Sequence, residues 1–506
     1  MPAKASPAPV QKSEERKFGL AHWMHEVLME AEKARADFAS DPVHDLRVAI
    51  RRCRSLGEGF QAVDPNPDWK KMRKAGKAVF AALGTLRDVQ VLMEWVEKLG
   101  SSDDPATQKL MTYCREQEAL HKVHAAEALA AFDGAQWKGW AISLPRSAAR
   151  LRPGSEVFQE MALERWAEAR ELHRVALRGR SKVALHRLRI GIKKLRYLVE
   201  NFLPSLHAAW SKDLKYLQDD LGEVHDLDVL WETAIRIQAF ATPEERTLWQ
   251  KKIAETREVR VDRYRAKMVG RGSLWDVWRS QLPQGPDVDR VILARLRVWA
   301  SFRDPDFQHA QRVATLSLHL HDGLVRTRLL APDGNHFRTL LKAAAITHEV
   351  GRAKGKESHH KAARRMIQKI NLPFGWKPED LAIVGLVARF HRGSLPSTQR
   401  QFRALSESGQ ATTRWLSGIL RLADALDRKH DGKIRRLRVS RHEGYLLVHA
   451  EGRELELRDA ERVAAARYLV EETCGVPVVV RTEAPKPLIV AEQPAPVRRN
   501  QARSSA

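Results

Sequence analysis

An internal duplication constrains the fold of this chain more than any other feature. Residues 43–60 (VHDLRVAIRRCRSLGEGF) match residues 185–202 (LHRLRIGIKKLRYLVENF), which lie 142 positions further along. Residues 83–92 (LGTLRDVQVL) match residues 221–230 (LGEVHDLDVL) at a nearly equal offset of 138. Composition alone does not produce two matches in the same order and at nearly the same spacing. The sequence therefore predicts two copies of one structural unit.

The duplicated region carries a helical pattern almost throughout. From Phe18 to about Leu282 it is rich in Ala, Leu, Glu, Arg and Lys, and Pro and Gly gather at breaks such as residues 65–68 (PNPD). No alternating strand pattern occurs there. After a second break at residues 282–291, another mostly helical region runs to His430.

The pattern changes after His430. Residues 431–441 and 444–459 alternate like two short strands joined at an HEG turn, followed by a helix at 460–474 and a strand at 476–482. We therefore predict a mainly α protein with a small α+β C-terminal piece. The expected parts are a disordered arm (1–17), a duplicated helical domain (18–284), a second helical domain (285–430), an α+β subdomain (431–483) and a disordered tail (484–506).

The charge of the chain points to its partners. Its 506 residues include 87 Lys and Arg against 63 Asp and Glu, a net charge of +24, which favours a polyanion or an anionic surface as partner. Three cysteines without a CxxC pair exclude a disulfide scaffold and a cysteine zinc ribbon. The sequence shows neither the apolar core of a signal peptide nor a membrane-spanning stretch. We expect a cytoplasmic protein that binds no membrane.

Each copy of the repeat places a cationic row beside an apolar stripe on one helix. In the first copy the stripe includes Val43, Leu46 and Ile50, and the row follows one residue behind. The rows comprise His44, Arg47, Arg51 and Arg54 in the first copy and His186, Arg189, Lys193 and Arg196 in the second. Neighbouring like charges repel one another unless an anion lies beside them. The alternative is a solvated helix face whose cations are partnered by structural carboxylates such as Asp88, Asp226 and Asp228.

These motifs resemble the two halves of a CHAD domain, the conserved-histidine α-helical domain, over about residues 18–284. The resemblance implies two helical bundles around a basic cavity that binds inorganic polyphosphate. Polyphosphate carries about one charge per phosphate and has no bases to read, so it would bind through cationic contacts with counterion release. The resemblance implies these contact residues: His44, Arg47, Arg51, Arg52, Arg54, His186, Arg189, Lys193, Lys194 and Arg196.

Histidines and carboxylates recur along the second half of the chain. Their order resembles the ligand order of HD-type phosphohydrolases, in which His and Asp residues hold one or two metal ions that activate water. The candidate ligands are His309, His348, Glu349, His359, His391 and Asp424. The alternative is a set of histidines that lie at the surface or at helix ends without binding metal.

A closer resemblance covers about residues 290–483. The segments DFQHAQRVATLSLHLHDGL, LVARFHRGSLP and LRLADALDR resemble the C-terminal, HD-like part of the exopolyphosphatase/guanosine pentaphosphate phosphohydrolase family. In that family catalysis belongs to an actin-like N-terminal half, for which this chain shows no pattern. Glu349 also stands where an HD site has Asp. The resemblance thus implies an accessory domain, with Arg352, His360 and Arg392 as a second set of phosphate contacts.

Two functional interpretations follow. The first is a polyphosphate-binding protein that requires no cofactor, carries little bound metal and releases no phosphate, with no catalytic residue assigned. The second is an HD-type phosphohydrolase that uses a divalent metal and acts on polyphosphate or a phosphorylated nucleotide. A polyphosphate-metabolising enzyme is a further candidate partner, and the resemblance suggests association with polyphosphate granules. Nucleic acid ranks last as a specific partner, because aromatic content is 7% and no recognised nucleic-acid module occurs.

Overall fold

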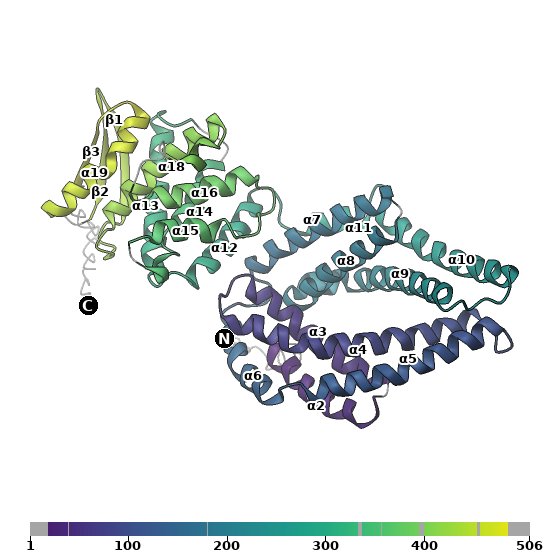
Figure 1. The fold of residues 1–506 in the computed structure, drawn as a ribbon. Helices are drawn as coiled ribbons and strands as arrows, with labels where there is room; N and C mark the ends of the chain where they lie inside the picture. The colour runs from purple at the N-terminus through teal and green to yellow at the C-terminus, as the bar shows by residue number, and fades with distance from the viewer. Residues whose placement is uncertain are drawn as a thin grey trace, which may run out of the picture. The chain divides into compact units, whose positions relative to one another are not determined.

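The computed structural model divides the chain into two compact units (Figure 1). Unit 1 comprises residues up to 305 together with 369–381, and unit 2 comprises residues 306–368 and those from 382 onward. The predicted disordered arm (1–17) and tail (484–506) lie outside the described residues. The structure describes residues 19–38, 40–179, 181–331, 336–355, 357–393, 399–452 and 456–483.

Unit 1 contains one series of five helices twice. The three central helices of the two copies have closely similar lengths: α3 and α8 have 22 and 21 residues, α4 and α9 have 33 each, and α5 and α10 have 26 each. The predicted duplication is therefore confirmed. The first series is α2 (Leu20–Asp37), α3 (Ser40–Gln61), α4 (Pro67–Leu99), α5 (Pro105–Ala130) and α6 (Gly134–Ala148). The second is α7 (Glu156–Gly179), α8 (Lys182–Phe202), α9 (Pro204–Arg236), α10 (Pro243–Met268) and α11 (Leu274–Gln281), and α12 (Pro286–Ser301) packs on α7.

Prolines and capping side chains determine where the long helices begin. Pro67 is the first residue of α4, and the side chain of Asn66 accepts a hydrogen bond from the backbone N–H of Asp68. Helix α10 begins in the same way at Pro243, after the capping residue Thr242. Proline suits this position because its missing N–H would have no partner within the helix. The PNPD break in the sequence is thus the start of α4.

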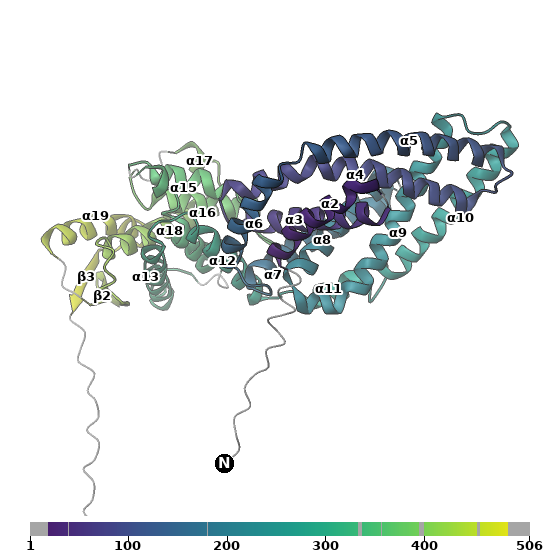
Figure 2. The same ribbon diagram turned by 90° about the horizontal axis from the view of Figure 1, so that it is seen from below.

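Helices α4–α5 and α9–α10 form two long hairpins, and the two repeats pack together at two places (Figures 1 and 2). Near α3 and α8 the core contains a cluster of aromatic rings, in which Phe158 and Phe202 stack at a centroid distance of 4.1 Å. A second core joins the distant ends of the hairpins and contains Trp95, Leu227 and Trp249. The two halves are therefore held together on both sides of the basic helices α3 and α8.

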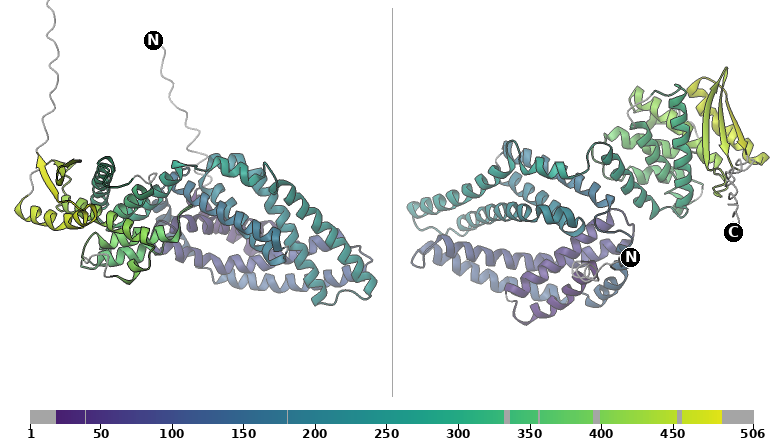
Figure 3. Two further views of the ribbon diagram at one scale, coloured as in Figure 1. Left: turned by 90° about the horizontal axis from the view of Figure 1, so that it is seen from above. Right: turned by 180° about the vertical axis from the view of Figure 1, so that it is seen from behind.

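Unit 2 is a helical bundle that carries a small sheet (Figure 3). Strands β1 (Arg436–His442) and β2 (Tyr445–Glu451) pair antiparallel, and β3 (Val478–Glu483) pairs parallel to β2. Helix α19 (Leu457–Cys474) connects β2 to β3 and packs against α18. The bundle comprises α13 (Phe307–Arg326), α14 (His336–Thr347), the 3-10 turn η1 (Arg352–Lys354), α15 (His359–Ile367), the larger part of α16 (Pro378–Phe390), α17 (Arg400–Arg403) and α18 (Glu407–Leu426).

The predicted fold class is confirmed, with one correction at the C-terminal end. The sequence pattern predicts a strand over 444–459, but β2 ends at Glu451 and α19 already begins at Leu457. Gly452 ends the strand because its φ of +152° suits glycine, and a Cβ there would clash with the carbonyl oxygen of Lys433. Among the described helices, none is both long and apolar enough to cross a membrane.

Candidate functional site

Helices α3 and α8 place the two cationic rows in unit 1. The predicted apolar stripe of α3 is buried, with Val43, Leu46 and Cys53 fully inaccessible, and the stripe of α8 is buried in the same way at Leu188 and Ile192. Burial of one stripe fixes the rotation of each helix about its axis. Because α3 contacts α8, the rows beside the stripes face a common region.

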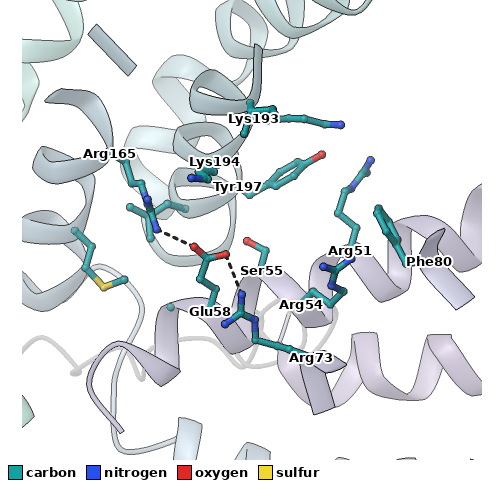
Figure 4. Close-up of a pocket in the computed structure, with 14 residues that line it drawn as sticks. Arg51, Arg54, Ser55, Glu58, Arg73, Phe80, Arg165, Lys193, Lys194 and Tyr197 are labelled. Carbon is teal, nitrogen blue, oxygen red and sulfur yellow. Dashed lines mark hydrogen bonds and ion pairs between the residues drawn. The ribbon is translucent and has the colours of Figure 1, made fainter. Parts of the chain in front are cut away.

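A cationic pocket lies where the two rows meet (Figure 4). Its volume is about 250 Å³, and both repeats contribute to its wall. Four of the predicted contact residues line it together: Arg51, Arg54, Lys193 and Lys194. The other polar and aromatic residues of the wall are Ser55, Glu58, Arg73, Phe80, Arg165 and Tyr197.

Two of the pocket cations, Arg51 and Arg54, lie against the faces of aromatic rings. The guanidinium of Arg51 lies 5.1 Å from the Tyr197 ring centroid, and that of Arg54 lies 4.9 Å from the Phe80 ring centroid. The Nε atoms of both arginines are buried without a hydrogen-bond acceptor. Burial, together with the positive charges of Arg189, Arg51 and Arg47, lowers the pKa of Lys193 to about 8. The pocket therefore has an excess of positive charge that an anion would neutralise.

The N-terminal ends of the two rows contact the second repeated segment, residues 83–92 on α4 and 221–230 on α9. Arg47 donates to the carbonyl oxygens of Leu83 and Gly84 on α4, at 3.0 and 3.2 Å. The ring of His186 lies 4.7 Å from that of His225 on α9. These contacts explain why residues 83–92 and 221–230 recur with the basic helices, because they supply the surface against which the rows pack.

Three of the predicted contacts are engaged by carboxylates. Arg52 forms an ion pair with Glu200 and donates to Asn201, and Arg196 lies 4.0 Å from the same Glu200 carboxylate. Lys194 lies 3.3 Å from Glu168. Of the other two predicted contacts, His44 is exposed on α3, whereas Arg189 has a buried Nε atom without an acceptor.

The three carboxylates of the alternative interpretation differ in their surroundings. Asp228 pairs with Arg257 at 3.0 Å and lies 3.8 Å from Lys182, so its partners lie outside the cationic rows. Burial raises the pKa of Asp226 to about 6, against the opposing charge of Arg189. Asp88 is a charged neighbour of Arg47. Asp226 and Asp88 therefore lie beside the cationic rows, whereas Asp228 is paired elsewhere.

The sequence interpretation missed several residues of the pocket wall, and Glu58, Tyr197, Arg73 and Arg165 are the most informative of them. Glu58 lies 2.8 Å from Arg165 and 3.5 Å from Arg73, and it joins α3 to α7 and α4 (Figure 4). Tyr197 lies four residues after Lys193, so extending the cationic row by one helical turn would have found it. Arg73 and Arg165 belong to α4 and α7 and carry no repeat signal. Only the packing of those helices brings them to the pocket.

In unit 2, the six predicted metal ligands come together in the core. All are buried: His309 lies on α13, His348 and Glu349 follow α14, His359 begins α15, His391 follows α16 and Asp424 lies on α18. They form two overlapping groups whose potential ligand atoms lie within 4.8 Å of one another. The first group is His309, His348, Glu349 and Asp424, and the second is Glu349, His359 and His391.

Glu349 belongs to both groups. Its Oε1 atom lies 3.3 Å from Nε2 of His359, 3.7 Å from Nε2 of His391 and 3.9 Å from Nε2 of His348. Burial favours the protonated acid, but the hydrogen bond from His359 and the neighbouring histidines outweigh it and lower the pKa of Glu349 to about 2. The extra methylene of Glu relative to Asp therefore does not take this carboxylate out of the cluster.

Backbone carbonyls orient two of the histidines. Nδ1 of His348 donates to the carbonyl oxygen of Ala345, and Nδ1 of His391 donates to that of Ala388, both at 2.6 Å. In each ring the Nε2 atom is then left with a lone pair that faces Glu349. Imidazole nitrogens fixed in this way, beside carboxylates, are a donor set that fits Zn²⁺ or Mn²⁺.

His309 is oriented by a carboxylate. Its Nδ1 lies 2.8 Å from Asp427, whose carboxylate also accepts from Arg312 at 2.9 Å, and its Nε2 lies 3.1 Å from Asp424. The ring stacks on that of His430 with a centroid distance of 3.6 Å. Burial opposes the charged form of His309, but the two carboxylate hydrogen bonds raise its pKa to about 9. Asp427 and His430 were not predicted, although LADALDR places Asp427 three residues after Asp424.

A glycine allows α15 to approach the cluster. A Cβ on Gly351 would lie 2.1 Å from the carbonyl oxygen of His359 and 2.7 Å from the backbone nitrogen of Ala363. Only glycine permits this approach of two backbone segments. The close packing places His359 against Glu349.

The three residues predicted as a second phosphate site differ in their surroundings. Arg352 pairs with Glu349 at 2.8 Å, so its charge is already neutralised. Arg392 is exposed, whereas His360 is half-buried, with a buried Nδ1 that has no hydrogen-bond acceptor. Burial, followed by the charges of His359 and Arg389, lowers the pKa of His360 to about 4.

Comparisons with known proteins agree with the two units. The CHAD domain family matches residues 20–234, and domain III of the Ppx/GppA phosphatases matches residues 301–473. One solved structure, a CHAD domain from the plant Ricinus communis, is 20% identical, with a TM-score of 0.36; the match covers 53% of this chain and 90% of that chain. No curated protein matches.

The fold and the two sites thus define a mainly helical protein with a cationic pocket in one unit and a buried histidine–carboxylate cluster in the other. The chain contains a CHAD domain followed by a Ppx/GppA phosphatase domain III. Both resemblances in the sequence are confirmed.

Proposed function

We propose that this protein binds inorganic polyphosphate in the cationic pocket between α3 and α8. The observation that carries the proposal is the convergence of both basic rows on one pocket, to which α4 and α7 add Arg73 and Arg165. Glu58 is the one carboxylate in the wall of this pocket. Such an excess of cations favours a ligand with repeated negative charges.

The arrangement of the cations suits a chain of phosphates better than a single anion. Arg51 and Arg54 lie one helical turn apart on α3, and Lys193 and Lys194 lie on α8 across the pocket. Arg47 and Arg189 continue the same rows toward the N-terminal end of each helix. A polyphosphate chain can contact successive cations along both rows, and each contact releases counterions.

Simultaneous substitution of four cations tests this proposal. We expect replacement of Arg47, Arg51, Arg189 and Lys193 by Ala to lower the affinity for long-chain polyphosphate by orders of magnitude, because each charge-assisted contact contributes about 1.5–3 kcal/mol. The slope of log affinity against log salt should also become shallower. A folded variant that keeps the wild-type slope would place polyphosphate binding elsewhere.

The histidine–carboxylate cluster supports a second candidate function, that of an HD-type phosphohydrolase. Its single supporting observation is that Glu349 reaches both groups of potential ligands. If a divalent metal binds there, His309, His348, Glu349 and Asp424 would hold one ion, and Glu349, His359 and His391 a second. Such an ion activates water for attack on a phosphoester or phosphoanhydride.

Within that candidate function the protein groups around the cluster have defined tasks. Ala345 and Ala388 keep the Nε2 atoms of His348 and His391 available, and Asp427 orients His309. Phosphate release from polyphosphate that requires Mn²⁺ or Mg²⁺, and that disappears in His348→Ala and Asp424→Ala, would support hydrolysis. No release under any metal condition would leave polyphosphate binding as the function of the chain.

The proposed partner is polyphosphate itself. A polyphosphate-metabolising enzyme is a second proposed partner, because domain III of the Ppx/GppA phosphatases here accompanies a CHAD domain. Association with polyphosphate granules in the cytoplasm follows if the proposal is right. Microscopy of the tagged wild type and the four-cation variant tests it, since only the wild type should localise with granules.

A further inference from the structure

A second group of cations lies beside the histidine–carboxylate cluster, on the same two helices. Helix α15 contributes His359 to the cluster. The next residue of this helix, His360, lies near the positive charges of Arg389 and Arg392. Arg364 follows His360 by one helical turn, on the same face of α15. Near the end of α16, Arg389 lies two residues before the cluster residue His391.

Three of these side chains lie close together. The ring of His360 is 5.6 Å from that of His359 and 6.4 Å from that of His391, measured between centroids. The side chain of Arg364 lies over Gly385 on α16, because a Cβ atom placed on Gly385 would be 3.6 Å from Cγ of Arg364. Burial and the charge of Arg389 both lower the pKa of Arg364. A Cβ on Gly393 would lie 3.6 Å from Nε2 of His360, and Arg389 stands four residues from both Gly385 and Gly393, so the packing of α15 on α16 places His360, Arg364 and Arg389 in one patch.

The patch has no carboxylate partner within the described ranges. No Asp or Glu there forms an ion pair with Arg364 or Arg389, and the side chain of Arg389 donates only to Gln399, at 3.1 Å. Nδ1 of His360 and the Nε atoms of both arginines are buried without an acceptor. Both arginines are half-buried, with only their Nε atoms inaccessible, and buried donors usually have a partner, which an anionic ligand would supply.

We propose that His360, Arg364 and Arg389, which we call the α15–α16 cation patch, bind one phosphate group of a condensed phosphate beside the histidine–carboxylate cluster. Guanidinium groups bind phosphate oxygens through paired N–H donors, which Lys does not provide. His360 is also one of the phosphate contacts expected from the sequence. Arg352, which was expected as well, is paired with Glu349 and does not belong to the patch. The proposal deepens the proposed function and rests on it only for the choice of condensed phosphate as ligand.

The surroundings of the patch favour a phosphate chain over a nucleotide. A nucleotide base usually stacks on an exposed aromatic ring. The aromatic ring nearest in sequence to Arg389 is Phe390, which is fully buried, and the other described neighbours include Gly385, Gly393 and Gln399. A condensed phosphate needs only the charges and N–H groups that the patch supplies.

The test uses the full chain in which Arg47, Arg51, Arg189 and Lys193 are replaced by Ala, so that the pocket of unit 1 contributes little. Binding of tripolyphosphate is measured by calorimetry in EDTA, which removes any metal contribution. Arg364→Gln or Arg389→Gln is then added, and Arg365→Gln is the matched control because Arg365 is the exposed neighbour of Arg364. We expect the residual affinity to fall about tenfold or more in the first two variants, since one charge-assisted contact is lost.

The outcomes separate this proposal from the pocket of unit 1. No residual binding, or the same loss in Arg365→Gln as in Arg364→Gln, would overturn the patch. If the four-cation background binds like the wild type, the pocket proposal fails, and the Arg364→Gln comparison still decides for or against the patch. Tighter binding of ATP than of tripolyphosphate would overturn condensed phosphate as the ligand. If Arg364→Gln fails to fold, Arg364→Lys should fold and still bind more weakly, because it keeps the charge but loses the paired donors.

Discussion

The Nε2 atoms of His359 and His391 lie 3.1 Å apart, with both rings buried in unit 2. Because His391 donates its Nδ1–H to Ala388, its Nε2 atom presents a lone pair to His359. Two ring nitrogens at this distance need a proton or a cation between them. Nε2 of His348 also faces carboxylate oxygens, at 3.9 Å from Glu349 and 3.6 Å from Asp424. The cluster therefore binds either protons or metal.

Added metal should stabilise the protein through this cluster. We expect Mn²⁺ to raise the melting temperature of the wild type, because a ligand present at 100 times its Kd stabilises a folded protein by about 2.7 kcal/mol. His391→Ala should abolish the shift, whereas the exposed His442→Ala should keep it. Thermal melts with and without EDTA, together with metal analysis of the dialysed protein, provide the measurement. An equal shift in wild type and His391→Ala would exclude the cluster as the binding site.

Lys193 should make polyphosphate binding pH-dependent. Burial and three neighbouring arginines lower its pKa to about 8, so in the free protein it loses its charge as the pH rises through 8. Affinity should therefore fall between pH 7 and pH 9.5, by roughly the tenfold that one lost cationic contact accounts for. Tyr197 should remain neutral over most of this range because burial raises its pKa.

Lys193→Arg provides the matched control for this pH dependence. An arginine keeps its proton throughout the range, so the alkaline loss of affinity should disappear. Titrations at constant ionic strength measure the effect. An unchanged alkaline loss in Lys193→Arg would assign it to another group.

Removal of a negative charge from the pocket should strengthen binding. Glu58 pairs with Arg165 and Arg73, and its carboxylate would repel a bound phosphate. We expect Glu58→Gln to raise polyphosphate affinity roughly fivefold, since one repulsion in a partly screened site costs about 1 kcal/mol. Asp68→Asn removes a charge from an ion pair with Lys71 at the start of α4 and should leave affinity unchanged. Weaker binding by Glu58→Gln would show that its ion pairs shape the pocket.

The sequence predicts most of the fold and part of each site, for identifiable reasons. The duplication sets the order of the helices, and the buried stripe that begins at Val43 fixes which face of α3 turns outward. Long-range packing is not encoded in a local pattern, so the contribution of Arg73 and Arg165 to the pocket was missed. The pairing of Arg352 with Glu349 was missed although the two residues are only three positions apart, a spacing at which side chains meet across one helical turn. The sequence shows which charged side chains are present, but their packing in the folded protein decides which charges remain unpaired.

The ion pair between Arg52 and Glu200 should be structural, although Arg52 was expected to contact the ligand. Arg52 on α3 pairs with Glu200 and donates to Asn201 on α8, so it joins the two repeats. Its side chain is 17% exposed and that of Glu200 is 12% exposed, so either group would remain partly buried after loss of the other. Removing one partner of a partly buried ion pair destabilises the fold by more than an exposed ion pair stabilises it, because the other charge stays buried without a partner. We therefore expect Arg52→Gln to lower the free energy of unfolding by about 1–3 kcal/mol. Denaturant unfolding measures this loss.

The same variant should leave ligand binding almost unchanged, which separates it from the pocket cations. Arg51→Gln, one residue earlier, is the matched control. It should weaken polyphosphate binding and reduce the slope of log affinity against log salt by about one. Its loss of stability should be smaller, because Arg51 has no carboxylate among its hydrogen-bond partners in the described part of the chain. Double substitution of Arg52 and Glu200 by Gln should recover part of the lost stability, since the Glu200 carboxylate no longer remains without Arg52. If Arg52→Gln instead reduces the salt slope as much as Arg51→Gln does, then Arg52 leaves Glu200 to contact the phosphate chain, and the original expectation for this residue holds.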